Sequence, residues 1–178
     1  MLRAILFLFL LAPVAQGQTS QLYGVYLTAE DFAAEKLASG FDAIGTNDFD
    51  DSSQQFLRIT LDSIAVIYDY KKIWGFRKKG VDWRIYDGDI FEVSYRGNDI
   101  IIYTLPGYLS YDQPIVYDTR FFSTDASGKL LPLTKRNLKR IYGQRAGFIE
   151  KMDSLPRPAT VAQWNRECRC YPVSQWLQ

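Results

Sequence analysis

Four acidic side chains lie close together in the middle of the chain, at Asp82, Asp87, Asp89 and Glu92. Two carboxylates held about 5–9.5 Å apart are the least that hydrolysis of a glycosidic bond requires when no histidine takes part. The segment therefore raises one catalytic alternative, a carboxylate-based hydrolase of polysaccharide. Carboxylates on turns and outward strand positions are also typical of ordinary solvated surface, so we assign no catalytic residue on this pattern.

Composition excludes most other catalytic centres. The chain has no histidine and two cysteines, Cys168 and Cys170. A Ser-His-Asp triad, a Cys-His dyad and an HExxH zinc site all need histidine, and two thiols are too few for a structural zinc site. We expect no metal and no cofactor. A disulfide between Cys168 and Cys170 closes a very tight ring and would be strained; this bridge, two separate thiols and an intermolecular link stay open as alternatives.

A cluster of basic residues suits binding better than catalysis. Thr134 is a helix N-cap for a helix predicted over residues 135–142, and Gly143 ends it. Lys135, Arg136, Lys139 and Arg140 fall outside the apolar stripe of this helix and form a basic outer face. Such a face predicts attraction to an anionic polymer or to an acidic partner protein, and a solvated helix surface has the same pattern.

Aromatic residues make up 15% of the chain, enough to build either a core or an exposed platform for a ligand. Trp74 precedes Gly75 in a predicted strand, where a neighbouring element can approach closely, so we expect Trp74 in the core. Strand alternation places Trp74 and Phe76 on one face, and places Trp83 and Ile85 together on one face. Cross-strand aromatic pairing in a core is the favoured interpretation of these residues.

Two tyrosines are the best candidates for an exposed aromatic binding surface. Tyr108 and Tyr111 follow the Pro106-Gly107 turn signal, where a loop leaves its side chains in solvent. We therefore include both among the candidate binding residues.

The first residues predict export. Met1–Arg3 is a short positive start, residues 4–12 are uninterruptedly apolar, and Ala15-Gln-Gly17 has the small-x-small form of a signal peptidase site. The run is too short to span a bilayer, which needs about 20 apolar residues. We predict a signal peptide over residues 1–17 and a mature chain from Gln18 that is periplasmic or secreted, with no membrane span.

Charge argues against nucleic acid as a partner. Without the predicted leader the chain carries 20 basic and 20 acidic residues, and a nucleic-acid binder needs a net basic field. The charges are unevenly spread, because residues 18–70 have a net charge of −7 and residues 71–178 a net charge of +7. The two halves are expected to attract each other within one fold.

The pattern along the chain predicts a single α+β domain over residues 18–178. A helix and an acidic loop are expected over 18–55 and short helices, two or three in number, over 130–178. Between them, residues 56–122 contain strand-like runs separated by short turns, which must pair antiparallel because a parallel return needs a long crossover. We expect an antiparallel meander of about six or seven strands. Its predicted strands are 56–61, 64–68, 73–77, 81–86, 90–95, 100–105 and 115–122.

Part of the chain resembles a group of uncharacterised exported proteins of Bacteroidota. The likeness covers roughly residues 64–150 and is carried by Ile73-Trp-Gly-Phe76, Trp83-Arg-Ile-Tyr86, Ile101-Ile-Tyr103, Phe121-Phe-Ser123 and Leu131-Pro-Leu-Thr-Lys-Arg-Asn-Leu138. The resemblance implies export in a Gram-negative setting and carries no catalytic residues. Together these observations favour a non-catalytic binding or structural module of the cell envelope, with a polysaccharide hydrolase and a periplasmic partner-regulating protein as alternatives. An anionic envelope polymer or an envelope protein is the expected partner.

Overall fold

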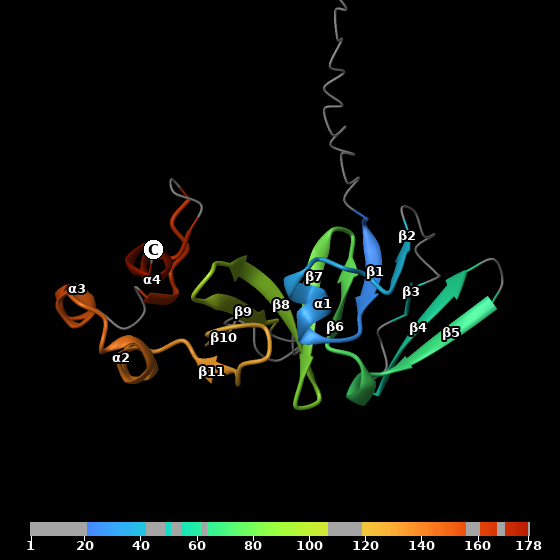
Figure 1. Cartoon of the computed structure of the whole chain (residues 1–178), viewed down its shortest axis with the longest axis horizontal. Coiled ribbons are helices and arrows are strands. Elements are labelled where there is room, and N and C mark those ends of the chain that lie inside the picture. The colour runs from blue at the N-terminus through green and yellow to red at the C-terminus, as the bar shows by residue number, and fades with distance from the viewer. Residues whose placement is uncertain are drawn as a thin grey trace, which may run out of the picture.

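The computed structural model describes residues 21–41, 49–50, 55–61, 64–106, 119–155, 161–166 and 170–177. Two antiparallel sheets and four short α-helices make an elongated molecule, with three helices at one end and the smaller sheet at the other (Figure 1). An α+β chain of mostly antiparallel strands is confirmed. One difference from the expected single meander is that the strands divide between two sheets.

The larger sheet has the strand order β11-β10-β9-β8-β7-β6-β1-β2. Strands β6 to β11 form a meander, and each pairs antiparallel with the next. β1 joins this meander by pairing with β6, and β2 pairs with β1. The strands are β1 (Tyr23–Tyr26), β2 (Ser39–Phe41), β6 (Gly75–Lys78), β7 (Val81–Tyr86), β8 (Asp89–Arg96), β9 (Ile101–Leu105), β10 (Thr119–Ser123) and β11 (Leu131–Pro132).

Two tight turns fix the register of the central hairpins. Lys79 and Gly80 both have positive φ, as do Asp87 and Gly88. Two-residue loops with φ > 0 at both positions match the right-handed twist of the strands that they join. The first loop is therefore one residue shorter than the three-residue loop expected from the sequence, because Lys78 pairs with Val81 at the end of the ladder.

The smaller sheet has the order β3-β4-β5 and contains the hairpin at residues 56–69. Its strands are β3 (Phe49–Asp50), β4 (Phe56–Leu61) and β5 (Ile64–Asp69), and the 3₁₀ helix η1 (Tyr70–Lys72) leads from β5 toward β6. Leu57 and Ile59 of β4 are fully buried and pack with Tyr23, Val25 and Phe76 of the larger sheet, with Tyr70 and Ile73 completing this cluster. One face of the small sheet is thus anchored to the large one.

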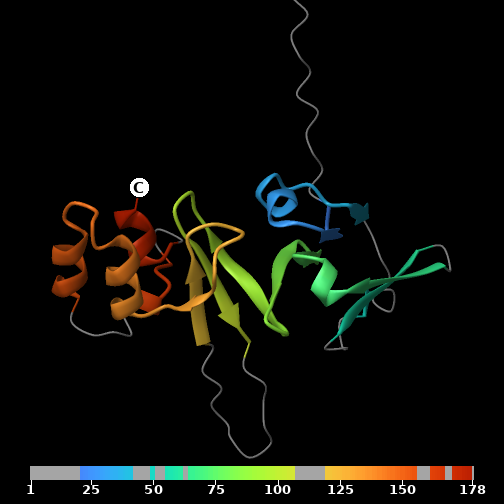
Figure 2. The same cartoon turned by 60° about the horizontal axis from the view of Figure 1, so that its bottom comes forward.

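Both faces of the large sheet are covered near β9. Alternation sends Ile102 to one face, where α2 (Lys135–Tyr142), α3 (Phe148–Ser154) and α4 (Pro172–Trp176) contribute to a buried apolar cluster. These helices gather beside the β9–β10 end of the sheet (Figure 2). Tyr103 points to the opposite face and packs in a cluster with Phe32 of α1 (Ala29–Ala33) and with Trp74.

Trp74 is a core residue, as predicted. It is 9% exposed, stacks on Phe32 with 4.0 Å between ring centroids, and donates its indole N–H to the Ala126 carbonyl at 2.7 Å. Phe76, however, packs on the opposite face, so its predicted common face with Trp74 is wrong. The strand is irregular before Gly75: the Trp74 N–H is shared between the carbonyls of Tyr26 and Leu27, and regular alternation begins only after it.

Near the C-terminus an isolated antiparallel bridge precedes the last helix. The backbone of Asn165 exchanges two hydrogen bonds with that of Cys170. The last helix is α4, which starts at Pro172. Proline fits the first turn of a helix because its missing N–H would have no partner there.

Candidate binding surface

The four central carboxylates do not form one site. Asp82 accepts two hydrogen bonds from the Arg77 guanidinium, at 2.6 and 3.0 Å, and one from the Tyr26 hydroxyl at 3.0 Å. Glu92 lies directly opposite Trp83 on the neighbouring strand, so it projects from the opposite face of the sheet to Asp82. Asp82 is therefore a partnered structural carboxylate, and it does not converge with Glu92.

The other two acids lie at the β7–β8 turn. Asp87 occupies the turn itself, with φ +54°, and Asp89 pairs with Tyr86 at the start of β8. Asp89 shares a face with Asp82, but the row of Arg84 and Phe91 lies between the two carboxylates along the strands. The arrangement gives no support to an acid–base pair in this hairpin.

Arg84 is a buried, hydrogen-bonded arginine that the sequence analysis did not identify. It is 4% exposed and lies in a cage of Trp74, Tyr86 and Tyr103, whose ring centroids are 5.0–5.5 Å from its guanidinium carbon. Its two terminal nitrogens donate to the Tyr103 hydroxyl at 3.1 Å and to the Gly128 carbonyl at 2.9 Å. Arg84 thus ties the segment after β10 to the sheet, a structural role. In the sequence Arg84 stands between Trp83 and Ile85, and nothing in that context indicates its burial.

The predicted basic face of α2 is only partly available. Lys135 donates to the Leu155 carbonyl and Lys139 forms an ion pair with Asp153, so both cations hold α3 against α2. Arg136 and Arg140 are exposed and make no ion pair among the described residues. Half of the expected docking charge is therefore engaged within the fold.

The remaining predicted residues are only partly described. Tyr108 and Tyr111 lie outside the described residues, as does Cys168. Cys170 is buried and disulfide-bonded. Its pairing with Cys168 stays a prediction.

The small sheet has a strand, β5, that pairs with another described strand on one side only. Tyr70 donates its N–H to the Gln55 carbonyl, and antiparallel pairs alternate between hydrogen-bonded and non-hydrogen-bonded. Counting along the register, Tyr68 and Val66 are hydrogen-bonded to β4, whereas Ile67 faces Arg58 in a non-hydrogen-bonded pair. The backbone N–H and C=O groups of Ala65 and Ile67 therefore point away from β4, toward the free edge.

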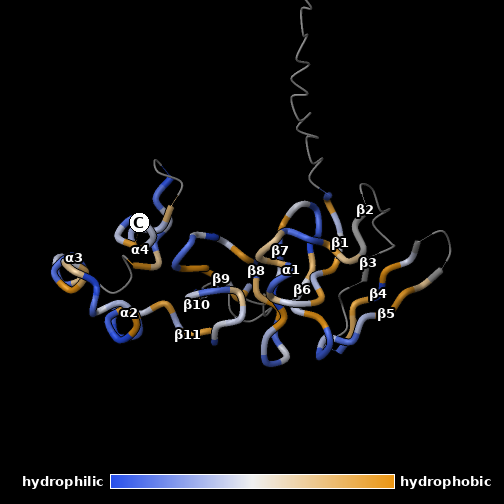
Figure 3. Tube along the Cα trace, viewed as in Figure 1, coloured by the Kyte–Doolittle hydropathy of each residue, from blue (hydrophilic) through white to orange (hydrophobic). Residues whose placement is uncertain are grey.

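The outer face of the same strand exposes apolar side chains. On this face Ile67 is 62% exposed and Phe56 of β4 is 38% exposed. The hydropathy colouring shows hydrophobic stretches along both β4 and β5, at the end of the molecule opposite the helices (Figure 3). An apolar edge strand of this kind is a template for pairing with another chain unless charge or proline blocks it.

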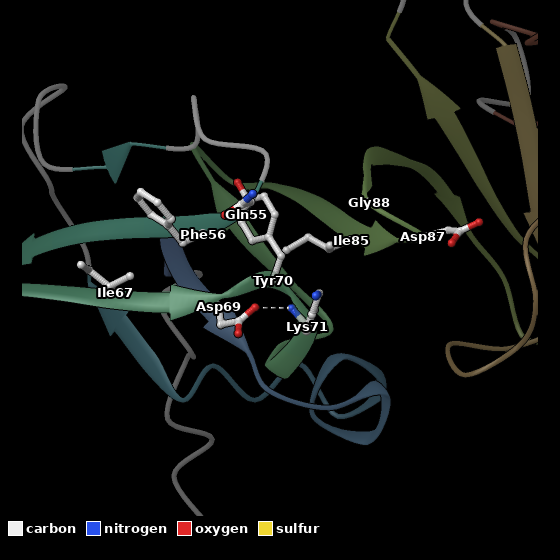
Figure 4. Close-up of a pocket in the computed structure, with 9 residues that line it drawn as sticks. All are labelled: Gln55, Phe56, Ile67, Asp69, Tyr70, Lys71, Ile85, Asp87 and Gly88. Atoms are coloured by element: carbon white, nitrogen blue, oxygen red, sulfur yellow. Dashed lines mark hydrogen bonds between the residues drawn. The ribbon is translucent and has the colours of Figure 1, made fainter.

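A pocket of about 810 Å³ adjoins this edge (Figure 4). Ile67 and Phe56 form its wall on the small sheet, and Ile85 and the Asp87-Gly88 turn form the wall on the large sheet. The described residues that line it are Gln55, Phe56, Ile67, Asp69, Tyr70, Lys71, Ile85, Asp87 and Gly88. The volume falls within the range of small-molecule and peptide side-chain sites.

The carboxylates of this pocket are open to an incoming cation. Asp69 accepts a hydrogen bond from the Lys71 backbone N–H at 2.9 Å, as the cap of η1, and Asp87 lies on the turn. Neither carboxylate makes an ion pair with another described residue, and Lys71 is the one cation among the described residues of the lining. A second, smaller pocket near the helices differs, since its Asp99 is paired with Arg145, which lowers the pKa of that carboxyl group.

Among the described residues, no group of three or more histidine, cysteine, aspartate or glutamate side chains is placed to hold a metal ion. None of the helices that these residues form is long and apolar enough to cross a membrane.

Comparison with known proteins found no matching family model, no matching curated protein and no matching solved structure. Function must therefore be inferred from the site itself.

Proposed function

We propose that this chain is an exported, non-catalytic binding module of the cell envelope and that it binds through the small sheet. The observation that carries the proposal is the position of Ile67 at the edge of the small sheet. Its side chain is 62% exposed, it lines the pocket, and its backbone hydrogen-bonding groups face the free edge of β5. A buried apolar contact and a ladder of backbone hydrogen bonds are both offered at one position.

The alternatives receive less support from the same residues. A hydrolase acting through the 82–92 hairpin needs two converging acids, and Asp82 is occupied by Arg77 and Tyr26. For an anionic polymer, only Arg136 and Arg140 of the four residues in the predicted basic face of α2 remain available. Export follows from the predicted leader, and a periplasmic or secreted location is part of the proposal.

Photo-crosslinking in the source cells tests the proposal. A photoreactive amino acid replaces Ile67 in one variant and Glu150, an exposed residue of α3, in a control variant. We expect a discrete adduct from position 67 in the envelope or secreted fraction, on a chain that begins at Gln18 by intact mass. Adducts of equal yield from both positions, or a chain retained in the cytosol with its leader, would contradict the proposal.

A further inference from the structure

We infer that the small sheet binds an extended polypeptide segment, which adds to the free edge of β5 as a further strand and places a basic side chain at the carboxylates of the pocket. This inference rests on the proposed function and names its partner class. The occupant is a peptide strand that carries an apolar residue and, two positions away, a lysine or arginine.

The backbone of β5 sets the mode of binding. Ala65 and Ile67 each offer one donor and one acceptor in the plane of the sheet, spaced as a β-ladder requires. The third strand of this sheet, β3, lies on the far side of β4, so no described strand pairs with this edge of β5. Strand addition of this type obtains affinity from main-chain hydrogen bonds and specificity from alternate side chains.

The side chains next to the edge set the sequence preference. Ile67 and Asp69 lie two positions apart and share the outer face of the small sheet, the face on which Phe56 stands opposite Asp69. A paired strand has the same period of two, so the residue beside Ile67 and the residue beside Asp69 are also two positions apart. Apolar contact with Ile67 and ionic contact with Asp69 then select an apolar and a basic residue two positions apart, in the order apolar-x-basic for a parallel strand and basic-x-apolar for an antiparallel one.

Charge favours such a peptide over a second copy of this chain. Among the described residues that line the pocket, Asp69 and Asp87 stand against a single cation, Lys71. Residues 64–69 read Ile-Ala-Val-Ile-Tyr-Asp, so two copies paired through β5 would bring no basic side chain to these carboxylates. A strand from another protein that carries lysine or arginine complements the site, whereas a self-pair leaves it unfilled.

The binding test uses fluorescent heptapeptides with capped ends. The probe is Thr-Val-Thr-Lys-Thr-Val-Thr, which has a valine two positions to either side of lysine and so fits parallel and antiparallel addition alike. One control replaces lysine by glutamate, and a second, Thr-Val-Lys-Thr-Thr-Val-Thr, moves lysine by one position and so to the other face of the strand. We expect saturable binding of the probe, with both controls weaker. No saturable binding of the probe at millimolar protein would overturn the inference.

Two protein variants separate the backbone from the charge. Ile67→Pro removes an N–H that points away from β4 and so leaves the ladder to β4 complete; it should lower affinity for the probe at least tenfold. Asp69→Asn removes the charge while keeping a side-chain oxygen that can cap η1; it should weaken lysine binding about two- to fivefold, the range of an exposed ion pair. Unchanged affinity in Ile67→Pro, with an unchanged circular dichroism spectrum, would also overturn the inference.

Two results would assign the edge differently. Concentration-dependent dimers in sedimentation that Ile67→Pro abolishes would give the edge to a second copy and reject the peptide. A specific cross-link from position 67 in cells, together with no peptide binding, would reject the peptide class and leave the proposed function standing.

Discussion

At the scale of single residues, long-range polar contacts from aromatic and arginine side chains hold the fold together. The indole of Trp74 and the guanidinium of Arg84 both donate to carbonyls in the segment between β10 and β11, those of Ala126 and Gly128. Neither carbonyl belongs to a strand, and a buried carbonyl left without a donor is costly. These two side chains position a segment that covers one face of the large sheet.

Trp74→Ala should lower the free energy of unfolding by about 3–5 kcal/mol, because it leaves a large cavity between Tyr26 and Phe32 and removes a buried hydrogen bond. Trp164, which is 38% exposed, is the matched control, and Trp164→Ala should cost less than about 1 kcal/mol. Urea titration of both variants measures the difference. A loss for Trp74→Ala as small as that expected for Trp164→Ala, below about 1 kcal/mol, would contradict the position of Trp74 in the core.

Buried tyrosines make stability depend on alkaline pH. Burial raises the pKa of Tyr26, Tyr103 and Tyr142 above the value of about 10 that the phenol has in an unfolded chain. Below pH 10 the phenols are neutral in both states and their contribution is complete. Above pH 10 the unfolded chain loses protons that the folded chain keeps, so stability falls, by up to about 1.4 kcal/mol per pH unit for each tyrosine.

Urea titrations between pH 8 and pH 11.5 measure this loss. Tyr103→Phe should reduce the slope above pH 10, because it removes one of the three phenols. A free energy of unfolding that stays level up to pH 11.5 would contradict the assignment of these tyrosines to buried sites.

Residue identity predicted the burial of Trp74 and missed that of Arg84. An indole next to a glycine in a strand is usually buried. Arginine is usually exposed, and the burial of Arg84 depends on aromatic side chains from other segments of the chain, which the local sequence does not show. The engagement of Lys135 and Lys139 was hidden for the same reason, since their partners belong to α3. Sequence spacing shows which cations share a helix face, and only tertiary packing shows which are already bound.

At the scale of elements, turn chemistry predicted most of the strands. β4 begins and ends where expected, β5 ends one residue later than expected, and β7 matches the predicted 81–86. The division into two sheets was not predicted, because the pairing of β1 with β6 joins residues about 50 positions apart and leaves the β4–β5 hairpin outside. Local turn signals carry no information about that pairing.

Gly75 is the element-scale position with the strongest constraint. A Cβ atom at residue 75 would lie 2.0 Å from the Trp83 carbonyl oxygen, which is backbone and cannot turn aside. Gly75→Ala should therefore separate β6 from β7 and cost at least about 3 kcal/mol, or prevent folding.

Gly88→Ala provides the comparison. Its Cβ meets nothing within 4 Å, and the substitution has only the cost of a positive φ. We expect a loss of about 1 kcal/mol. Thermal denaturation of the two variants compares steric contact with backbone conformation, and a smaller loss for Gly75→Ala than for Gly88→Ala would contradict the close approach of β6 and β7.

At the scale of the whole molecule, the two ends differ in how fully their apolar side chains are buried. The helical end closes a buried cluster with α2, α3 and α4, and two cations of α2 are engaged there. The other end leaves β5 with an exposed isoleucine and a pocket beside it. A natural protein usually protects such an edge, so its exposure is the strongest indication of a binding surface.

Amide hydrogen exchange of the ¹⁵N-labelled mature chain, alone and with unlabelled envelope extract, tests this account most directly. In the free chain the N–H groups of Ala65 and Ile67 should exchange fast, and those of Val66 and Tyr68 slowly, because only the latter pair donates to β4. With extract, Ala65 and Ile67 should become protected. No protection at these two amides, or protection confined to α2, would contradict the assignment of the small sheet as the binding surface.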